Sequence, residues 1–296
     1  MASAAIHVGA RRAEALAARL PPLLVAAERV AATVAQGVHG RRRVGPGDSF
    51  WQFRPFVAGD AAARIDWRQS AKSGRPEPHG WFVRETEWEA AQTVCLWHDA
   101  SASMRWRSAL APVEKQERAA LLLLALAALL LRGGERVSLM AADSRPLAGR
   151  AGLDRLAEAL SNADTDSPGL PPDMRLPRHA RVVLLGDFLS PLPEIQAVIA
   201  RLAGIPVTGT LLQVLDPAEE LLPYSGRIRF RGLEREGETL IPRVEGIRQA
   251  YTEKLRAQQD GLRDLCAAAR FSFSIHRTDH SPEAALLGLY TAMAAR

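Results

Sequence analysis

Two aspartates and two serines are the side chains in this sequence whose spacing best suits chemistry. Asp99 begins the run Asp99-Ala100-Ser101-Ala102-Ser103, and Asp187 follows a second apolar run at 181–185. A turn that leaves a strand can direct residues one, three and five of such a run into one concavity. Carboxylate and hydroxyl oxygens are the ligands that Mg²⁺ prefers in proteins. We therefore predict a magnesium site formed by Asp99, Ser101, Ser103 and Asp187.

A simpler interpretation of the same residues stays open. Aspartates at the ends of strands often cap the following helix, and a short Asp-x-Ser-x-Ser run also occurs by chance in loops. The spacing alone does not decide between a metal site and an ordinary helix cap.

Apolar strands alternate with helices from residue 91 onward, and this order must position the site. We expect strands at 93–97, 136–141, 181–185, 207–215 and 271–276, and helices at about 113–132, 152–162, 193–203, 244–269 and from 282. This alternation predicts an α/β fold, a doubly wound and mostly parallel sheet with helices on both faces. Ligands of such sheets bind beyond the carboxyl ends of the strands. If the strands at 93–97 and 181–185 are neighbours, Asp99 and Asp187 meet there.

The first 90 residues differ from the rest in composition. Residues 41–84 contain nine basic and four acidic residues, which accounts for the whole formal net charge of +5, and all six Trp lie at 51–106. Residues 8–36 predict a helix, or a helix pair broken at Pro21-Pro22. We therefore divide the chain into a helix plus a basic, Trp-rich module of short strands and loops (1–90) and an α/β domain (91–296). Gly45-Pro46-Gly47-Asp48 indicates a turn in the first module, and Glu236-Gly237 indicates a hairpin inserted in the α/β domain near 226–243.

Basic residues interleaved with tryptophan could bind single-stranded nucleic acid. The acids in the same segment favour another interpretation, in which its Arg residues pair with Asp48, Asp60 and Asp66 while the Trp residues pack a small core. We favour the second interpretation, and nucleic-acid binding through 41–84 is the alternative.

The length of the apolar runs and the positions of the cysteines indicate the cellular compartment of the protein. The longest apolar run, 119–131, has thirteen residues, whereas a membrane-spanning helix needs about 20. Charged residues interrupt the N-terminal segment, so no signal peptide is predicted. Cys95 and Cys266 lie in apolar segments and are predicted to be buried free thiols. We predict a cytoplasmic protein without a membrane span.

These motifs resemble two known families. Asp99, Ser101, Ser103 and Asp187 resemble the metal-ion-dependent adhesion site of von Willebrand factor type A domains. Residues 37–296 resemble the bacterial domain of unknown function 58, which is often associated with MoxR-type AAA+ ATPases. The matching residues are His39-Gly40-Arg41, Gly45-x-Gly47, Phe50-Trp51, Arg54, Gly59-Asp60, Arg64-Ile65-Asp66-Trp67-Arg68, Ser70-Ala71-Lys72, Arg84-Glu85-x-Glu87 and Asp216-Pro217-x-Glu219.

The resemblance implies a non-enzymatic adaptor rather than an enzyme. It implies a von Willebrand factor A-like fold and a MoxR-type AAA+ ATPase as partner, working in the assembly or activation of client complexes. A partner or client Asp or Glu would complete the coordination of Mg²⁺ at the adhesion site. That site usually includes a Thr, and Thr165 is the only Thr between Ser103 and Asp187, in loosely matching surroundings.

A magnesium-dependent phosphohydrolase that uses Asp99 and Asp187 is the enzymatic alternative. Haloacid-dehalogenase-type enzymes carry a second Asp two residues after the first, and here that position is Ser101. The sequence has no G-x-S-x-G elbow, and we predict no catalytic residues.

Overall fold

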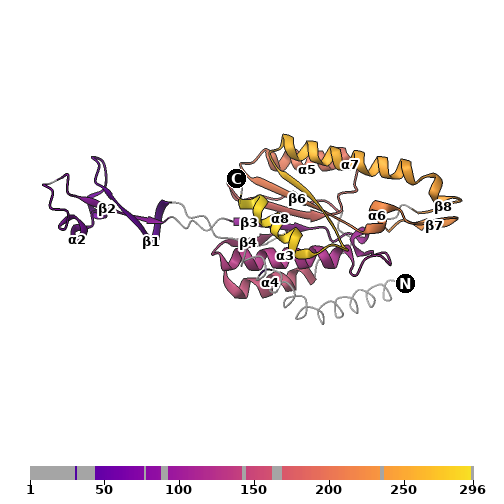
Figure 1. The fold of residues 1–296 in the computed structure, drawn as a ribbon, viewed down its shortest axis with the longest axis horizontal. Coiled ribbons are helices and arrows are strands. Elements are labelled where there is room, and N and C mark those ends of the chain that lie inside the picture. Colours follow the sequence, from indigo (N-terminus) through magenta and orange to yellow (C-terminus); the bar gives the residue numbers. More distant parts are fainter. Residues whose placement is uncertain are drawn as a thin grey trace. The chain divides into compact units, whose positions relative to one another are not determined.

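The computed structural model describes residue 31 and residues 44–76, 78–87, 93–141, 145–161, 169–233 and 237–294. The chain divides into two compact units, Val38–Ala91 and the remainder, Met1–Gly37 with Gln92–Arg296. Apart from Ala31, the predicted helical segment 8–36 lies outside the described residues. Figure 1 shows the elements of both units.

A five-stranded parallel sheet forms the centre of the larger unit. Its strands are β3 (Thr93–His98), β4 (Arg136–Leu139), β5 (Arg181–Gly186), β6 (Thr208–Leu215) and β9 (Ser272–Arg277). They lie in the order β4-β3-β5-β6-β9, and every neighbouring pair is parallel. The predicted α/β class with a parallel sheet is confirmed.

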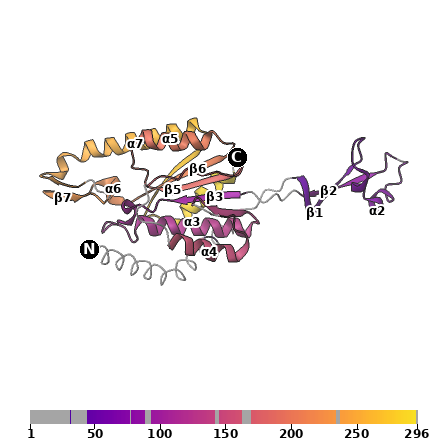
Figure 2. The ribbon, with the colours of Figure 1, turned by 180° about the vertical axis from the view of Figure 1, so that it is seen from behind.

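Helices cover both faces of this sheet, as expected for strands that are apolar along their whole length. Helix α3 (Lys115–Arg132) packs on one face with α8 (Pro282–Ala294), and α4 (Gly149–Ser161) lies beside α3. Helices α5 (Leu192–Ala203) and α7 (Arg248–Ala268) cover the other face (Figures 1 and 2). None of the helices within the described ranges combines the length and apolar character needed to cross a membrane.

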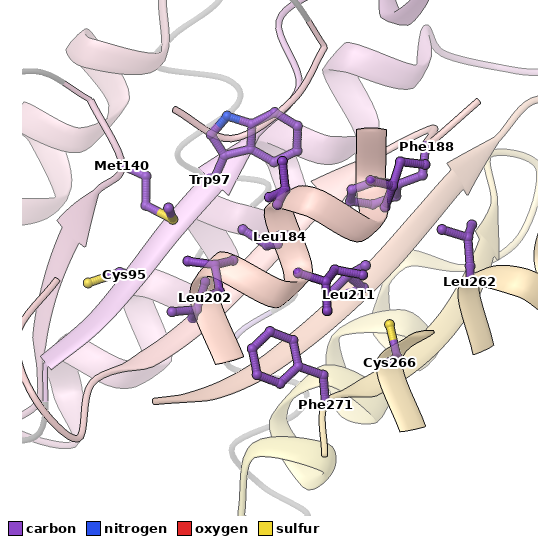
Figure 3. Packing of buried hydrophobic residues seen from close by; sticks show 14 of the residues in the cluster. Cys95, Trp97, Met140, Leu184, Phe188, Leu202, Leu211, Leu262, Cys266 and Phe271 are labelled. Carbon is purple, nitrogen blue, oxygen red and sulfur yellow. The ribbon is translucent and has the colours of Figure 1, made fainter. Parts of the chain in front are cut away.

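The core between the sheet and α5 with α7 contains both cysteines. Cys95 and Cys266 are buried free thiols, as predicted, among Trp97, Leu184 and Phe271 (Figure 3). Burial raises the pKa of Cys95 to about 11 and that of Cys266 to about 12. Both thiols are therefore protonated at neutral pH and unreactive.

A glycine in β6 lets this core close. A Cβ atom on Gly209 would lie 2.2 Å from the ring of Phe271. A larger residue there would push the ring out of the space between β6 and α7, so the close approach requires glycine.

Short elements follow the last residues of β6. Helix α6 (Pro217–Leu221) comes first, and then β7 (Ile228–Arg231) and β8 (Glu238–Ile241) pair as an antiparallel hairpin. The 3-10 turn η3 (Val244–Gly246) then leads into α7. Figure 1 shows α6 and the hairpin beyond the end of the sheet at which β6 finishes.

The unit Val38–Ala91 is built on two antiparallel strands, β1 (Val44–Pro55) and β2 (Phe82–Glu87), with the 3-10 turn η1 (Ala62–Arg64) and the short helix α2 (Trp67–Ser70) between them. One sequence prediction is wrong here. The expected turn at 45–48 lies within β1, where both Val44 and Ser49 pair with Glu87 because the strand bulges. A bulge absorbs the extra residues without ending the strand.

Trp67 and Trp81 are the tryptophans of this unit whose side chains the structure describes, and only Trp81 is half-buried. Trp81 stacks edge-on against Phe56 and Trp67, with ring centroids 5.4 and 5.6 Å apart. Trp67, however, is 58% exposed. The expectation that the Trp residues pack into a small core is therefore wrong for Trp67.

Candidate functional site

Asp99 and Asp187 leave the sheet side by side because their strands are neighbours. β3 and β5 pair in parallel register, with His98 opposite Leu185. The Asp99 N–H continues this ladder and donates to the Leu185 carbonyl at 2.8 Å. Parallel neighbouring strands end at the same edge, so both carboxylates lie at the carboxyl end of the sheet.

The residues after Asp99 turn back into a short 3-10 helix, η2 (Ala102–Arg105). Asp99 Oδ1 accepts the Ser101 N–H at 2.8 Å, which fixes the start of the turn. The Ser101 and Ser103 hydroxyl oxygens lie 3.0 Å apart, and Ser103 Oγ donates to Asp187 Oδ2 at 2.7 Å. The structure thus brings Asp99, Ser101, Ser103 and Asp187 into one cluster.

The inner half of this cluster is covered. Asp99 and Ser101 are each 1% exposed. A Cβ atom on Gly169, whose φ is +68°, would lie 3.7 Å from Asp99 Oδ2 and from Ser101 Oγ. The chain at Gly169 therefore passes directly over these two residues.

Asp187 is held through its backbone as well as its side chain. Its carbonyl accepts Gln213 Nε2 of β6 at 2.8 Å, and its Oδ1 accepts the Leu189 N–H at 3.3 Å. The next residue, Phe188, is buried with φ 49°, a left-handed conformation that is strained for an aromatic side chain. Gln258 of α7 secures this strained turn by donating to the Phe188 and Ser190 carbonyls.

A lysine that the sequence analysis did not identify lies at the centre of the site. Lys115 is the first residue of α3, and its side chain is 0% exposed. Its ammonium group donates to Asp187 Oδ2 at 3.0 Å and to Glu219 Oε1 at 2.5 Å. Asp187 Oδ2 therefore accepts both the Ser103 hydroxyl and the Lys115 ammonium.

Glu219 comes to the site from α6, immediately after β6. Asp216 caps this helix by accepting the Ala218 N–H at 2.8 Å, while Glu219 Oε2 accepts the Asp216 N–H at 2.9 Å. This reciprocal capping box fixes the orientation of the first turn of α6. Asp216 also accepts the Ser108 N–H at 2.8 Å, which ties the segment before α3 to α6.

The two ends of the ion pair respond differently to burial. Burial by itself would lower the pKa of Lys115, but the carboxylates of Asp187 and Glu219 together outweigh burial and raise this pKa above its ordinary value. Burial raises the pKa of Glu219, and the nearby ammonium only partly offsets it. Because two carboxylates surround one ammonium group, we conclude that Lys115 is charged at neutral pH.

The oxygen atoms of the cluster have suitable spacing for a magnesium ion, but the charge distribution does not fit one. Neighbouring ligands of octahedral Mg²⁺ at about 2.1 Å lie about 3 Å apart, which resembles the serine and aspartate separations. A divalent ion on Asp187 Oδ2, however, would lie beside a buried ammonium group that already uses this oxygen, and two positive charges repel strongly where water is excluded. No group of three or more His, Cys, Asp or Glu side chains in the described part of the chain could hold a metal. The described residues therefore do not fit Mg²⁺ while Lys115 is charged, and the magnesium site stays a prediction.

Four of the five predicted metal ligands are described, and the fifth is not. Thr165 lies outside the described residues. Lys115, Glu219 and Gln213 are the site residues that the sequence analysis did not predict as such. Lys115 could have been found from its spacing to Ala119, Leu122 and Leu126, because steps of four, three and four residues place it on the buried stripe of α3.

Solved structures match this chain only weakly. A conserved hypothetical protein BatB from Bacteroides thetaiotaomicron matches with 16% identity and a TM-score of 0.34, over 70% of this chain and 100% of that one. An aerotolerance-related membrane protein from Bacteroides fragilis matches with 15% identity and a TM-score of 0.37, also over 70% of this chain and 100% of that one. Both scores are too low to support any conclusion about this chain.

No curated protein matches the sequence. The family described as protein of unknown function DUF58 matches residues 52–261. This range is well over half of the chain and runs from β1 through four strands of the parallel sheet (β3 to β6) and the Lys115 site into α7, ending before β9. The chain therefore belongs to the DUF58 family.

Proposed function

We propose that this protein is a non-enzymatic adaptor that binds a partner protein at the carboxyl end of its sheet. The observation that carries the proposal is a set of exposed leucines in the segments that leave three adjacent strands. Leu110 follows β3 and is 51% exposed, Leu189 follows β5 and is 42% exposed, and Leu221 follows β6 and is 49% exposed. We refer to these three residues as the leucine rim.

Single exposed leucines are ordinary on protein surfaces. The leucine rim is unusual because each member is anchored to the buried site. The Leu189 N–H donates to Asp187, and the Leu110 N–H donates to Ser108, whose own N–H donates to Asp216. Leu221 ends the helix that carries Glu219. Exposed apolar side chains on an anchored backbone suit a protein interface, because little backbone entropy is lost when a partner covers them.

Asp99 is less suited to the phosphohydrolase alternative. A carboxylate that attacks phosphate must reach the substrate, and Asp99 is 1% exposed and accepts the Ser101 N–H. A role in holding the turn in place is more consistent with this environment.

We propose a MoxR-type AAA+ ATPase as the partner, because such ATPases are associated with the family that this chain resembles. The test is to immobilise the full chain and measure its Kd for the MoxR-type ATPase of the same organism by biolayer interferometry. Leu189→Glu should weaken binding at least about tenfold, since it places a charge in an interface that should be apolar.

The matched control is Leu287→Glu in α8. Leu287 has the same residue type and the same 42% exposure as Leu189 but lies on a helix that covers a face of the sheet. Equal loss of binding in the two variants would contradict the proposed binding face, and no binding by the wild-type chain would contradict the choice of partner.

A further inference from the structure

A lysine ammonium group lies where the sequence predicts a metal ion. We infer that Lys115 is the resident cation of the site at the carboxyl end of the sheet, and that the site is complete without a divalent metal. The inference concerns the buried residues around Asp187 and does not depend on the proposed adaptor function.

The ammonium group makes the connections that a bound ion would make. Lys115 starts the helix that follows β3, Asp187 is the first residue after β5, and Glu219 lies in the helix that follows β6. The two hydrogen bonds of 3.0 and 2.5 Å from Lys115 therefore join the segments leaving three adjacent strands. A metal in a site of this kind stabilises the fold by the same kind of connection.

The backbone holds the lysine at this position. The capping box of α3 fixes its first turn: Glu114 accepts the N–H of Glu117, and the Glu117 side chain accepts the Glu114 N–H. The Lys115 N–H donates to the Trp106 carbonyl at 3.4 Å. With the backbone fixed and the side chain wholly buried, the ammonium group is confined to the space between the two carboxylates.

A metal would have to overcome this arrangement. Asp187 Oδ2 has two donors, the Ser103 hydroxyl at 2.7 Å and the Lys115 ammonium at 3.0 Å. Mg²⁺ releases its own waters reluctantly, and at this oxygen it would also face a buried positive charge. Removing the lysine charge would leave Asp187 and Glu219 without their ammonium partner, and the site should then accept a divalent cation.

The test compares the response of Lys115→Met and wild type to metal. Thermal unfolding of the full chain is followed by circular dichroism in EDTA and in millimolar MgCl₂ or MnCl₂, and binding is measured by isothermal titration with the same metal salts. Wild-type Tm should be the same in all buffers, with no binding heat. Lys115→Met should have a lower Tm in EDTA and should regain about 5 °C or more when the metal is at about 100 times its Kd.

Each outcome decides the inference. A wild-type Tm that rises with Mg²⁺, and no longer does so in Asp187→Asn, would overturn it. A Lys115→Met chain that folds and ignores both metals would also overturn it. If Lys115→Met is unfolded in EDTA, Mn²⁺ should restore the folded chain, and failure to do so counts against the inference. A metal-sensitive wild type would leave the adaptor proposal intact, because the Leu189→Glu test does not involve Lys115.

Discussion

Charged side chains differ greatly in solvent exposure between the unit Val38–Ala91 and the carboxyl end of the parallel sheet. Residues 41–84 of the first region hold the entire excess of basic residues. The clearest ion pair of this region, Arg54 with Asp60, is nevertheless 30% and 15% exposed, and Arg68, Lys72 and Arg75 are exposed. The second has no excess of positive charge, yet Lys115 is 0% exposed and its partners Asp187 and Glu219 are 7% and 16% exposed.

This difference shows that the number of charges in a segment is a poor guide to their energetic importance. Water and salt screen the exposed Arg and Lys residues, and an exposed pair contributes about 1 kcal/mol or less. A buried charge that loses its partner costs several times more.

The largest effect is expected at Lys115. Lys115→Met should lower the free energy of unfolding by about 3–5 kcal/mol, because it leaves the buried carboxylate of Asp187 and the half-buried carboxylate of Glu219 without their cation. Urea unfolding at neutral pH measures the change. The control, Lys254→Met, replaces an exposed lysine of α7 and should change stability by less than about 0.5 kcal/mol. A similar small change for Lys115→Met would remove the contrast between the two regions.

A second large effect should depend on pH. Burial and the neighbouring Arg118 lower the pKa of His276 from 6.5 to about 4, and Arg118 Nη1 lies 3.5 Å from His276 Nε2. The unfolded chain therefore binds a proton at higher pH than the folded chain does. The contribution of His276 to the free energy of unfolding is therefore fully present above pH 6.5. It is lost as the pH falls towards 4, and the loss over this whole range is about 3 kcal/mol.

His276→Gln should remove this part of the acid sensitivity. Urea midpoints of wild type and variant at pH 7 and pH 4.5 measure it, and the difference between the two proteins should shrink as the pH falls. His98, whose pKa burial also lowers, is present in both proteins and cancels in the comparison. Parallel pH profiles for the two proteins would contradict the assignment.

A smaller effect is expected at Arg54, which pairs with Asp60 in the unit Val38–Ala91. Its guanidinium binds both oxygens of Asp60 at 2.6 Å, and Asp60 also accepts the Val57 N–H at 2.9 Å. Because both side chains are partly exposed, Arg54→Ala should cost about 1 kcal/mol locally, or about fivefold in the opening equilibrium. Hydrogen exchange of the peptide 53–60 measures this. Arg68→Ala, which replaces an exposed arginine, should leave the exchange of that peptide unchanged.

The smallest effect is expected where both charges face solvent. Arg263 and Asp260 form a pair on α7 with 56% and 70% exposure. Arg263→Ala should change the free energy of unfolding by less than about 0.5 kcal/mol, and about 1 M NaCl should abolish even that difference. If Arg263→Ala changed the free energy of unfolding as much as Lys115→Met does, the exposure of an ion pair would not predict its contribution to stability.

Much of the fold could be predicted, because the periodicity of apolar residues and the local composition indicate where strands and helices lie. The apolar runs at 93–97 and 181–185 match β3 and β5, and the apolar run after Arg118 matches the buried length of α3. The local sequence pattern predicted a turn at Gly45 to Asp48, whereas these residues lie at a register irregularity within β1. Gly and Pro mark both features, and only the pairing with β2 distinguishes them.

The candidate site was predictable in part, because strand-end position can be inferred from order along the chain. Asp99, Ser101, Ser103 and Asp187 follow two apolar runs, and parallel pairing is enough to bring them together. Glu219 lies 104 residues from Lys115, and no local pattern connects a helix that follows β3 to one that follows β6.

The alternation of strands and helices, the oxygen atoms at the strand ends and the location of the net charge all follow from the order of residues along the chain. Which charges are buried depends on the folded arrangement, and that arrangement places a lysine ammonium group, rather than exposed arginines, at the centre of the site. The physical reason is that hydrophobic periodicity is encoded locally, whereas the energy of a charge depends on the solvent and partners that distant segments remove or supply.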